Sequence, residues 1–157
     1  MGTYSIGVDY GTNSVRALVV DAADGAELAS HVFSYPSGEA GILLDPKDPN
    51  LARQNPADYV EWFFAAVAAA VRAARQTPGF DAARVVGIGI DTTGSTPIPV
   101  DKAGTPLAFR PEFKDDLAAQ AWLWKDHTGH AEAAAITEAA RKAGVPYLTA
   151  CGGTYSS

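Results

Sequence analysis

The chain has 157 residues, of which 47% are hydrophobic and 19% are charged, and its formal net charge is −6 at pH 7. This length is sufficient for one domain with a buried core. The acidic balance argues against a nucleic-acid-binding protein, which would carry a basic patch, and it suits substrates that are neutral or are anions carried with Mg²⁺.

Cysteine content and hydropathy both favour an intracellular setting. The one cysteine, Cys151, excludes an intrachain disulfide and favours a reducing compartment. The N-terminal apolar stretch is short and interrupted by Asp9, unlike a signal peptide. No run approaches the roughly 18–20 apolar residues of a membrane span. We therefore expect a soluble cytoplasmic protein with no membrane partner.

The first predicted element is a hairpin over residues 4–21 whose tip is suited to a phosphate group. Apolar residues alternate up to Asp9, a turn with glycine and hydroxyl side chains follows, and a second apolar run ends at Asp21. Gly11 allows close approach of an anion, and consecutive N–H groups in a turn form an anion-binding nest. Asp9 suits a Mg²⁺ ion that arrives with phosphate. An ordinary hairpin turn explains the same residues.

A third strand is predicted over residues 26–35, which makes the N-terminal part a three-stranded antiparallel meander. Residues 34–55 are rich in proline and glycine and predict a long surface loop. A helix then starts with Asn55 as N-cap and Pro56 at its first position, and Pro78-Gly79 ends it. Its predicted apolar face consists of Val60, Phe63, Phe64, Val67, Val71 and Ala74.

Residues 84–91 are a short, continuous apolar run, which predicts a strand buried on both faces. The polar residues 91–96 follow its carboxyl end, where open α/β sheets bind ligands. A second hairpin is predicted over 97–109, and 118–124 fits either a strand or a helix. The last predicted helix starts near Thr128 and runs to about residue 143, ended by glycine and proline.

Several other side chains are candidate site residues. His127 and His130 have the spacing of metal ligands, but a helix start between them and the lack of a second ligand cluster argue against a metal. Cys151 has no base nearby in sequence, and neither a P-loop nor a dinucleotide-binding motif is present. Trp124 beside Lys125 and Asp126 offers a polyol an apolar wall with hydrogen-bonding groups, although a core tryptophan explains it equally well.

Taken together, these motifs resemble the FGGY carbohydrate kinases, which belong to the actin, Hsp70 and sugar-kinase superfamily. Residues 7–16 resemble the family's first phosphate loop. Residues 86–97, with Arg110-Pro-Glu-Phe113, Leu123-Trp-Lys-Asp-His-Thr128 and the C-terminal 152–157, resemble its ribulokinase branch. The resemblance runs along essentially the whole chain, from residue 5 to 157.

The resemblance implies an α/β fold of the ribonuclease H-like (actin-like ATPase) type, with a mixed sheet, the N-terminal meander and flanking helices. Because family members are several times longer, residues 1–157 are expected to be the N-terminal part of the first of two actin-like domains. The remainder of that domain and the whole second domain would be absent. Such an incomplete domain would expose apolar surface, and self-association or a homo-oligomer is expected.

The resemblance also implies ATP and Mg²⁺ as cofactors and L-ribulose as the sugar, phosphorylated on its terminal hydroxyl in L-arabinose catabolism. The general base is expected beyond residue 157, so no residue here is assigned as catalytic and the chain alone is expected to be inactive. Asp9 is expected to meet Mg²⁺ through phosphate or water. Open alternatives are another pentulose kinase such as a xylulokinase, a non-catalytic sugar- or nucleotide-binding module of the same fold, and a structural piece that folds only with a partner. The implied ATP-phosphate residues are Asp9, Gly11, Thr12, Asn13, Ser14 and Arg16, and the implied sugar residues are Thr93, Gly94, Ser95, Thr96, Trp124, Lys125 and Asp126.

Overall fold

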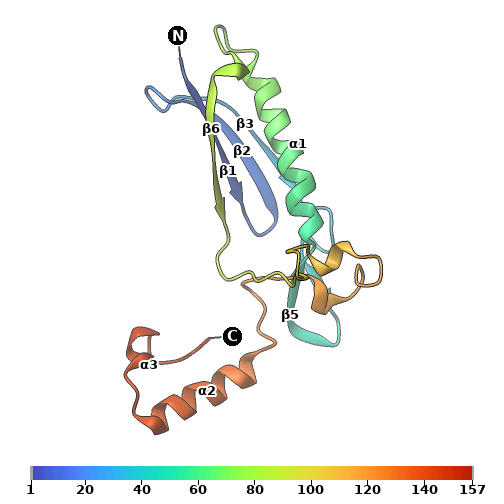
Figure 1. The fold of residues 1–157 in the computed structure, drawn as a ribbon, viewed down its shortest axis with the longest axis vertical. Helices are drawn as coiled ribbons and strands as arrows, with labels where there is room; N and C mark the ends of the chain where they lie inside the picture. The colour runs from blue at the N-terminus through green and yellow to red at the C-terminus, as the bar shows by residue number, and fades with distance from the viewer. Residues whose placement is uncertain (1, 157) are drawn as a thin grey trace.

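The computed structural model describes residues 2–156, and its largest element is a four-stranded mixed sheet with the strand order β3-β2-β1-β6 (Figure 1). Strands β1 (Tyr4–Tyr10), β2 (Ser14–Asp21) and β3 (Glu27–Ser34) form the predicted antiparallel meander. Strand β6 (Val85–Thr92) adds to β1 in parallel. The carboxyl ends of β1 and β6 therefore lie at the same edge of the sheet.

Helix α1 (Pro56–Ala74) covers one face of this sheet (Figure 1). The Asn55 side chain caps it as predicted, accepting a hydrogen bond from the Ala57 N–H at 3.0 Å. The predicted apolar face is partly wrong, because Val60 and Phe64 are exposed. The fully buried helix residues of the contact are alanines, which permit close approach, while Phe63, Val67 and Val71 of the predicted face pack against the core and are only partly buried. The buried core includes Ile6, Val8, Val15, Ala17 and Val19 of the sheet and Ala66, Ala70 and Ala74 of the helix.

A second, three-stranded sheet has the order β4-β5-β7, and its existence contradicts the predicted loop over residues 34–55. Strands β4 (Leu43–Asp45) and β5 (Asp48–Gln54) form a hairpin, and β7 (Ala121–Trp122) pairs with the end of β5. Proline is tolerated at Pro49 because it lies at the start of β5, where a missing donor matters least. The polar composition hid this strand, because Arg53 pairs with Asp126 and Gln54 bonds to Thr12, and both partners lie far away in the sequence.

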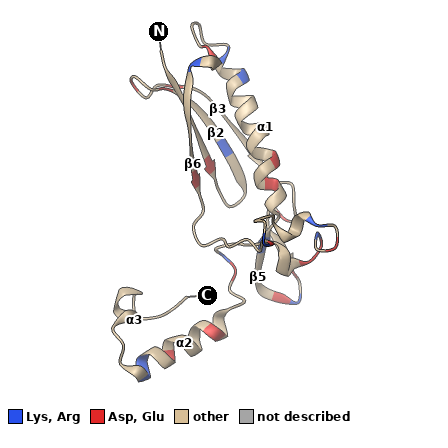
Figure 2. Ribbon diagram, viewed as in Figure 1, with Lys and Arg blue, Asp and Glu red and all other residues tan. Residues whose placement is uncertain are grey.

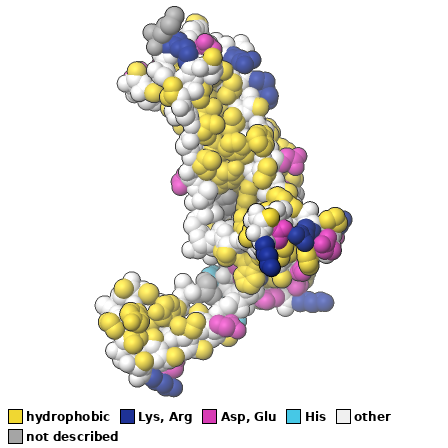
Figure 3. Space-filling model, in the orientation of Figure 1, with side chains coloured by type: hydrophobic (Ala, Val, Ile, Leu, Met, Phe, Trp, Pro, Cys, Tyr) yellow, Lys and Arg dark blue, Asp and Glu magenta, His cyan; other side chains and the backbone are white. Residues whose placement is uncertain are grey.

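Strand β6 exists as predicted, but the prediction that both its faces are buried is wrong. The side chains of Val86, Ile88 and Ile90 are between 51% and 70% exposed. The reason is its place at the sheet edge, because α1 packs mainly on β2 and β3. Figure 3 shows hydrophobic side chains gathered along α1 and the neighbouring edge of the sheet.

The C-terminal third of the chain consists mainly of short elements. The predicted hairpin over 97–109 is reduced to one bridge between Val100 and Pro106 and a 3₁₀ turn. The ambiguous segment 118–124 contains the 3₁₀ turn Leu117–Ala119 and then β7. Helix α2 (His130–Ala143) and the unpredicted α3 (Tyr147–Ala150) follow, and they lie away from the sheet (Figure 1).

The limits of α2 test two predicted helix signals. Gly144 ends the helix as predicted, because its φ of 65° is the left-handed conformation that glycine adopts most easily. Thr128 is not the N-cap; Gly129 occupies that place, and the Thr128 hydroxyl donates to Asp126 instead. Among residues 2–156, no helix combines the length and the apolar character that a bilayer span requires.

Candidate functional site

An open cleft of about 780 Å³ lies at the carboxyl ends of β1 and β6. It brings together three segments that are far apart in the sequence: the turn after β1, the polar segment after β6, and the tryptophan that follows β7. Open α/β sheets bind ligands at this edge. The lining residues are Asp9, Tyr10, Gly11, Thr12, Asp91, Thr92, Thr93, Gly94, Ser95, Trp124 and Ser156.

Hydrogen bonds from the rest of the protein fix the turn between β1 and β2. The Gly11 N–H donates to the Ser14 carbonyl at 2.9 Å and closes the turn. The Thr12 carbonyl accepts from the Gln54 side chain at 2.7 Å, and the Asn13 carbonyl accepts from the Tyr35 N–H at 2.9 Å. Within residues 2–156, the N–H groups of Thr12 and Asn13 have no protein acceptor. Thr12 lines the cleft and Asn13 follows it in the turn, so both N–H groups can donate to an anion that is bound against the turn.

Two carboxylates lie side by side at the edge of the cleft. The parallel register of β1 and β6 places Asp9 opposite Asp91, and β2 places Arg16 on the other side of Asp9. Figure 2 shows acidic residues at the ends of β1 and β6. Asp91 was predicted only as part of the polar segment 91–96 at the ligand-binding edge and was not assigned to the phosphate, the metal or the sugar. Its signal in the sequence was an acid at the end of a predicted strand, the same pattern that singled out Asp9.

This pair of carboxylates fits a magnesium ion that is carried by phosphate. Mg²⁺ keeps several waters and uses one or two carboxylates together with phosphate oxygens. The part of the chain that the structure describes holds no group of three or more His, Cys, Asp or Glu side chains that would form a protein-only metal cage. Asp9 and Asp91, beside the free N–H groups of the turn, match a Mg²⁺ ion that is held by two carboxylates together with phosphate oxygens.

The segment after β6 presents Thr93, Gly94 and Ser95 to the cleft. Ser95 has a φ of 55°, a left-handed conformation that non-glycine residues rarely adopt. The hydroxyl of Thr96 lies 3.4 Å from that of Thr93, and Thr96 faces a second, smaller cavity of about 250 Å³ behind the sheet edge. Thr93, Gly94 and Ser95 therefore face the cleft, whereas Thr96, which follows the bend at Ser95, does not.

Trp124 contacts the turn between β1 and β2 directly. It is half-exposed, and its indole N–H donates to the Thr12 hydroxyl at 3.0 Å, across 112 residues of sequence. The Lys125 ammonium group lies 5.2 Å from the centre of its ring. One hydrogen bond therefore joins the aromatic ring of Trp124 to the turn between β1 and β2, and both line the cleft.

Asp126 is buried, does not line the main cleft, and forms an ion pair with Arg53 of β5. It also accepts from the Ala52 N–H at 2.8 Å and from the Thr128 N–H at 3.1 Å. Burial disfavours its charge, but hydrogen bonds from Thr128, Ala52 and Arg53 outweigh burial and hold the pKa of Asp126 below its usual range. Asp126 thereby fastens the segment that carries Trp124 to the second sheet.

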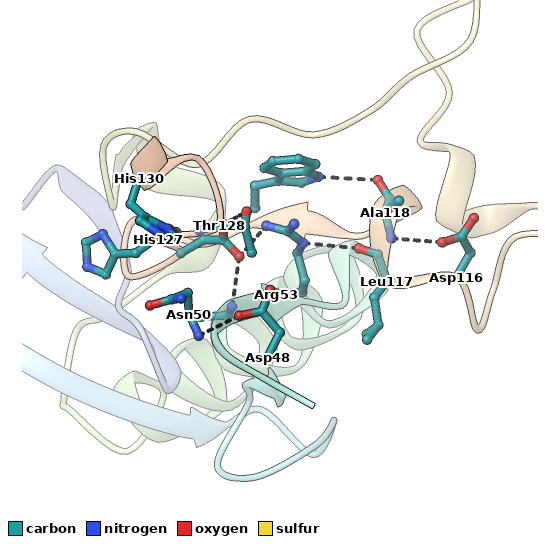
Figure 4. A network of polar contacts seen from close by, with 12 residues as sticks. Asp48, Asn50, Arg53, Asp116, Leu117, Ala118, His127, Thr128 and His130 are labelled. Atoms are coloured by element: carbon teal, nitrogen blue, oxygen red, sulfur yellow. Dashed lines mark hydrogen bonds and ion pairs between the residues drawn. The ribbon is translucent and has the colours of Figure 1, made fainter. Parts of the chain in front are cut away.

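Arg53 makes two further contacts that hold this segment against the second sheet. Its guanidinium carbon lies 3.6 Å from the centre of the Trp122 ring, and its Nε donates to the Leu117 carbonyl at 3.2 Å. Figure 4 shows the hydrogen bond between Arg53 and Leu117, which belongs to the 3₁₀ turn that precedes β7. His127 lies in the same network, where its N–H donates to the Asn50 carbonyl at 2.8 Å.

A chain of hydrogen bonds between tyrosine and glutamine side chains leads to the turn between β1 and β2. The Tyr59 hydroxyl donates to Gln54 Oε1 at 2.6 Å, and the Tyr10 hydroxyl donates to the Tyr59 carbonyl at 3.0 Å. Burial raises the pKa of Tyr10, and burial together with Asp58 raises that of Tyr59. Both hydroxyls therefore stay protonated donors at neutral pH. Gln54 was missed because it fell in the predicted surface loop.

The remaining predicted residues lie outside the cleft lining. The Asn13 side chain donates to the Ala40 carbonyl at 2.6 Å, and Ser14 begins β2. Arg16 faces a groove on the uncovered side of the sheet, which it shares with Asp9. Thr96, Lys125 and Asp126 are placed as described above, and Cys151 is an exposed free cysteine in the turn that follows α3.

Residues 4–147 match the N-terminal domain of the FGGY family of carbohydrate kinases. The chain belongs to this family. It is 42% identical to a ribulokinase of Geobacillus thermodenitrificans over 98% of this chain and 27% of that protein. It is also 42% identical to a ribulokinase of Vibrio parahaemolyticus, over 97% of this chain and 26% of that protein. The chain thus spans about a quarter of the length of these relatives.

Solved structures agree on the fold. A gluconate kinase from Lactobacillus acidophilus superposes on 92% of this chain and 23% of its own with a TM-score of 0.61, at 17% sequence identity. An identity this low shows the fold alone. The predicted α/β fold of the actin-like ATPase type, with its mixed sheet and N-terminal meander, is confirmed.

Proposed function

We propose that the chain is the N-terminal part of the first actin-like domain of a pentulose kinase, which transfers the γ-phosphoryl group of ATP to the terminal hydroxyl of L-ribulose in L-arabinose catabolism. The observation that carries the proposal is the hydrogen bond from Trp124 to Thr12, because it joins an aromatic wall to an anion-binding turn in one cleft. Identities of 42% to two ribulokinases support L-ribulose over other pentuloses. ATP and free pentuloses occur in the cytoplasm, where the enzyme would work.

In this proposal the chain's own residues bind and orient both substrates. The N–H groups of Thr12 and Asn13 donate to phosphate oxygens, and Gly11 allows the phosphate to approach the backbone. Asp9 and Asp91 would hold Mg²⁺, which supplies positive charge to the β- and γ-phosphates when bound. Phosphoryl transfer relies on positioning and charge stabilisation of this kind.

The same proposal assigns the cleft residues near Trp124 to the sugar. The Trp124 ring covers the apolar C–H face of the pentulose, and the Thr93 and Ser95 hydroxyls exchange hydrogen bonds with its hydroxyl groups. The base that takes the proton from the attacking hydroxyl is proposed to lie beyond residue 157. The chain by itself therefore binds ligands without turnover, and the complete kinase closes the cleft against water.

The test is release of ADP by the complete kinase with MgATP and one sugar at a time. We expect kcat/KM to be highest with L-ribulose and lower with D-xylulose and D-ribulose. A preference for D-xylulose would replace the substrate and keep the reaction. Binding of MgATP without ADP release from any pentulose would overturn the kinase proposal in favour of a non-catalytic module of the same fold.

A further inference from the structure

Gln54 is a buried polar residue outside the cleft with both ends of its side chain in use. It is the last residue of β5, directly before the cap of α1, and only 2% of it is exposed. Its Nε2 donates to the Thr12 carbonyl at 2.7 Å, and its Oε1 accepts from the Tyr59 hydroxyl at 2.6 Å. A carbonyl oxygen only accepts, so the amide nitrogen must be the end that faces Thr12.

The carbonyl that Gln54 holds belongs to the same peptide group as the N–H of Asn13. A trans peptide group is planar, and its C=O and N–H bonds point in opposite directions. The described residues contain no cis peptide bond. Fixing the Thr12 carbonyl toward β5 therefore turns the Asn13 N–H away from β5. That N–H is one of the two donors in the turn without a protein acceptor.

Tyr59 fixes the orientation of the glutamine in turn. The tyrosine hydroxyl reaches Gln54 from the first turns of α1, and burial keeps it protonated at neutral pH. With its Oε1 engaged by that hydroxyl, the amide cannot rotate without losing both hydrogen bonds. A buried amide that loses its partners is strongly disfavoured. The Thr12–Asn13 peptide is thus held in one orientation before any anion arrives.

We propose that Gln54 is a positioning residue that holds the Asn13 N–H pointing away from β5, where it donates to a phosphate group of the nucleotide bound against the turn. Its effect on kinetics rests on the proposed kinase function, whereas its effect on the turn does not. Gln54 touches no reacting atom and acts only through the Thr12–Asn13 peptide. Its removal should therefore weaken nucleotide binding more than sugar binding.

The kinetic test compares Gln54→Met with a matched control in the complete kinase. Gln120 is also 2% exposed, and its Nε2 donates to the Lys114 carbonyl at 2.8 Å, away from the turn. We expect Gln54→Met to raise KM for MgATP about tenfold, the worth of one buried hydrogen bond. We expect Gln120→Met to leave that KM unchanged, and KM for the sugar to change less than twofold in both variants. Equal effects of the two variants on KM for MgATP would overturn the proposal.

A second measurement is independent of kinase activity. In the 157-residue chain, ¹⁵N relaxation reports the order parameter of the Asn13 N–H bond. We expect about 0.85 in the wild type and in Gln120→Met, and a fall below about 0.6 in Gln54→Met. Tyr59→Phe keeps the ring and removes only the hydroxyl, so it should lower the value by less and remains informative if Gln54→Met does not fold. An unchanged order parameter in Tyr59→Phe and Gln54→Met would refute the positioning role even in an active kinase.

Discussion

The buried ion pair between Arg53 and Asp126 makes the sharpest prediction about stability. Both side chains are nearly inaccessible, and the pair joins β5 to the segment that carries Trp124. Asp126→Asn keeps the shape but leaves the guanidinium buried without its counter-charge. Removing one partner of a buried pair costs about 3–5 kcal/mol. We expect the free energy of unfolding of the 157-residue chain to fall by that amount in urea at pH 7.

A matched control separates burial from charge. Glu138 forms exposed pairs with Arg141 at 3.7 Å and with Lys142 at 3.6 Å. Glu138→Gln should therefore change the free energy of unfolding by less than about 0.5 kcal/mol. Replacing both buried partners with Met and Leu should recover part of the loss, because no buried charge remains. If Asp126→Asn cost less than about 1 kcal/mol, the ion pair would not be what fastens this segment.

The same pair predicts a direction of pH dependence. The pKa of Asp126 in the folded chain lies below its ordinary value, because hydrogen bonds to its charged form outweigh the cost of burial. Its contribution to stability is therefore fully present above the unfolded-state pKa of about 3.9 and is lost as the pH falls through the folded-state pKa. Urea unfolding at pH 7 and at acid pH should show a steeper loss in the wild type than in Asp126→Asn.

Three further predictions concern the cleft and the sheet edge. Trp124→Phe keeps an aromatic ring but removes the donor to Thr12, so KM for the sugar and for MgATP should both rise about fivefold; a rise for the sugar alone would show that the hydrogen bond does not couple the two halves. Asp9→Asn should lower kcat about 100-fold and raise the Mg²⁺ requirement, and an unchanged Mg²⁺ titration would remove Asp9 from the metal site. Ile88→Lys should reduce self-association of the 157-residue chain in size-exclusion chromatography, whereas Val100→Lys, at the same 51% exposure but away from the sheet edge, should not; a monomeric wild type would contradict this.

Local signals were sufficient to predict the meander and the start of α1. Alternating apolar residues and a glycine-containing turn specify a hairpin, and Asn55 before Pro56 specifies a helix start, because each depends on neighbours within a few residues. The hairpin of the second sheet was missed for the opposite reason. Arg53 and Gln54 are polar, and their burial depends on Asp126 and Thr12, which lie far away in the sequence.

The residues of the candidate site also divide into those that the sequence predicts and those that it does not. Residues that line the cleft at strand ends were predictable, because the carboxyl edge of a parallel pair is a general ligand position. Asp126 was assigned to the sugar by resemblance, yet it lies in a buried ion pair, and a run of Trp-Lys-Asp-His has the same appearance in either role. The burial of β6 was mispredicted because an apolar strand does not encode which element will cover it.

The proposed transfer of phosphate from ATP to L-ribulose is tested most directly by ³¹P NMR of the complete kinase with MgATP and L-ribulose. We expect the γ-phosphate signal of ATP to disappear while ADP and a sugar phosphomonoester signal grow at equal rates. Growth of inorganic phosphate without a sugar phosphate, or an unchanged ATP spectrum, would contradict phosphoryl transfer to the sugar.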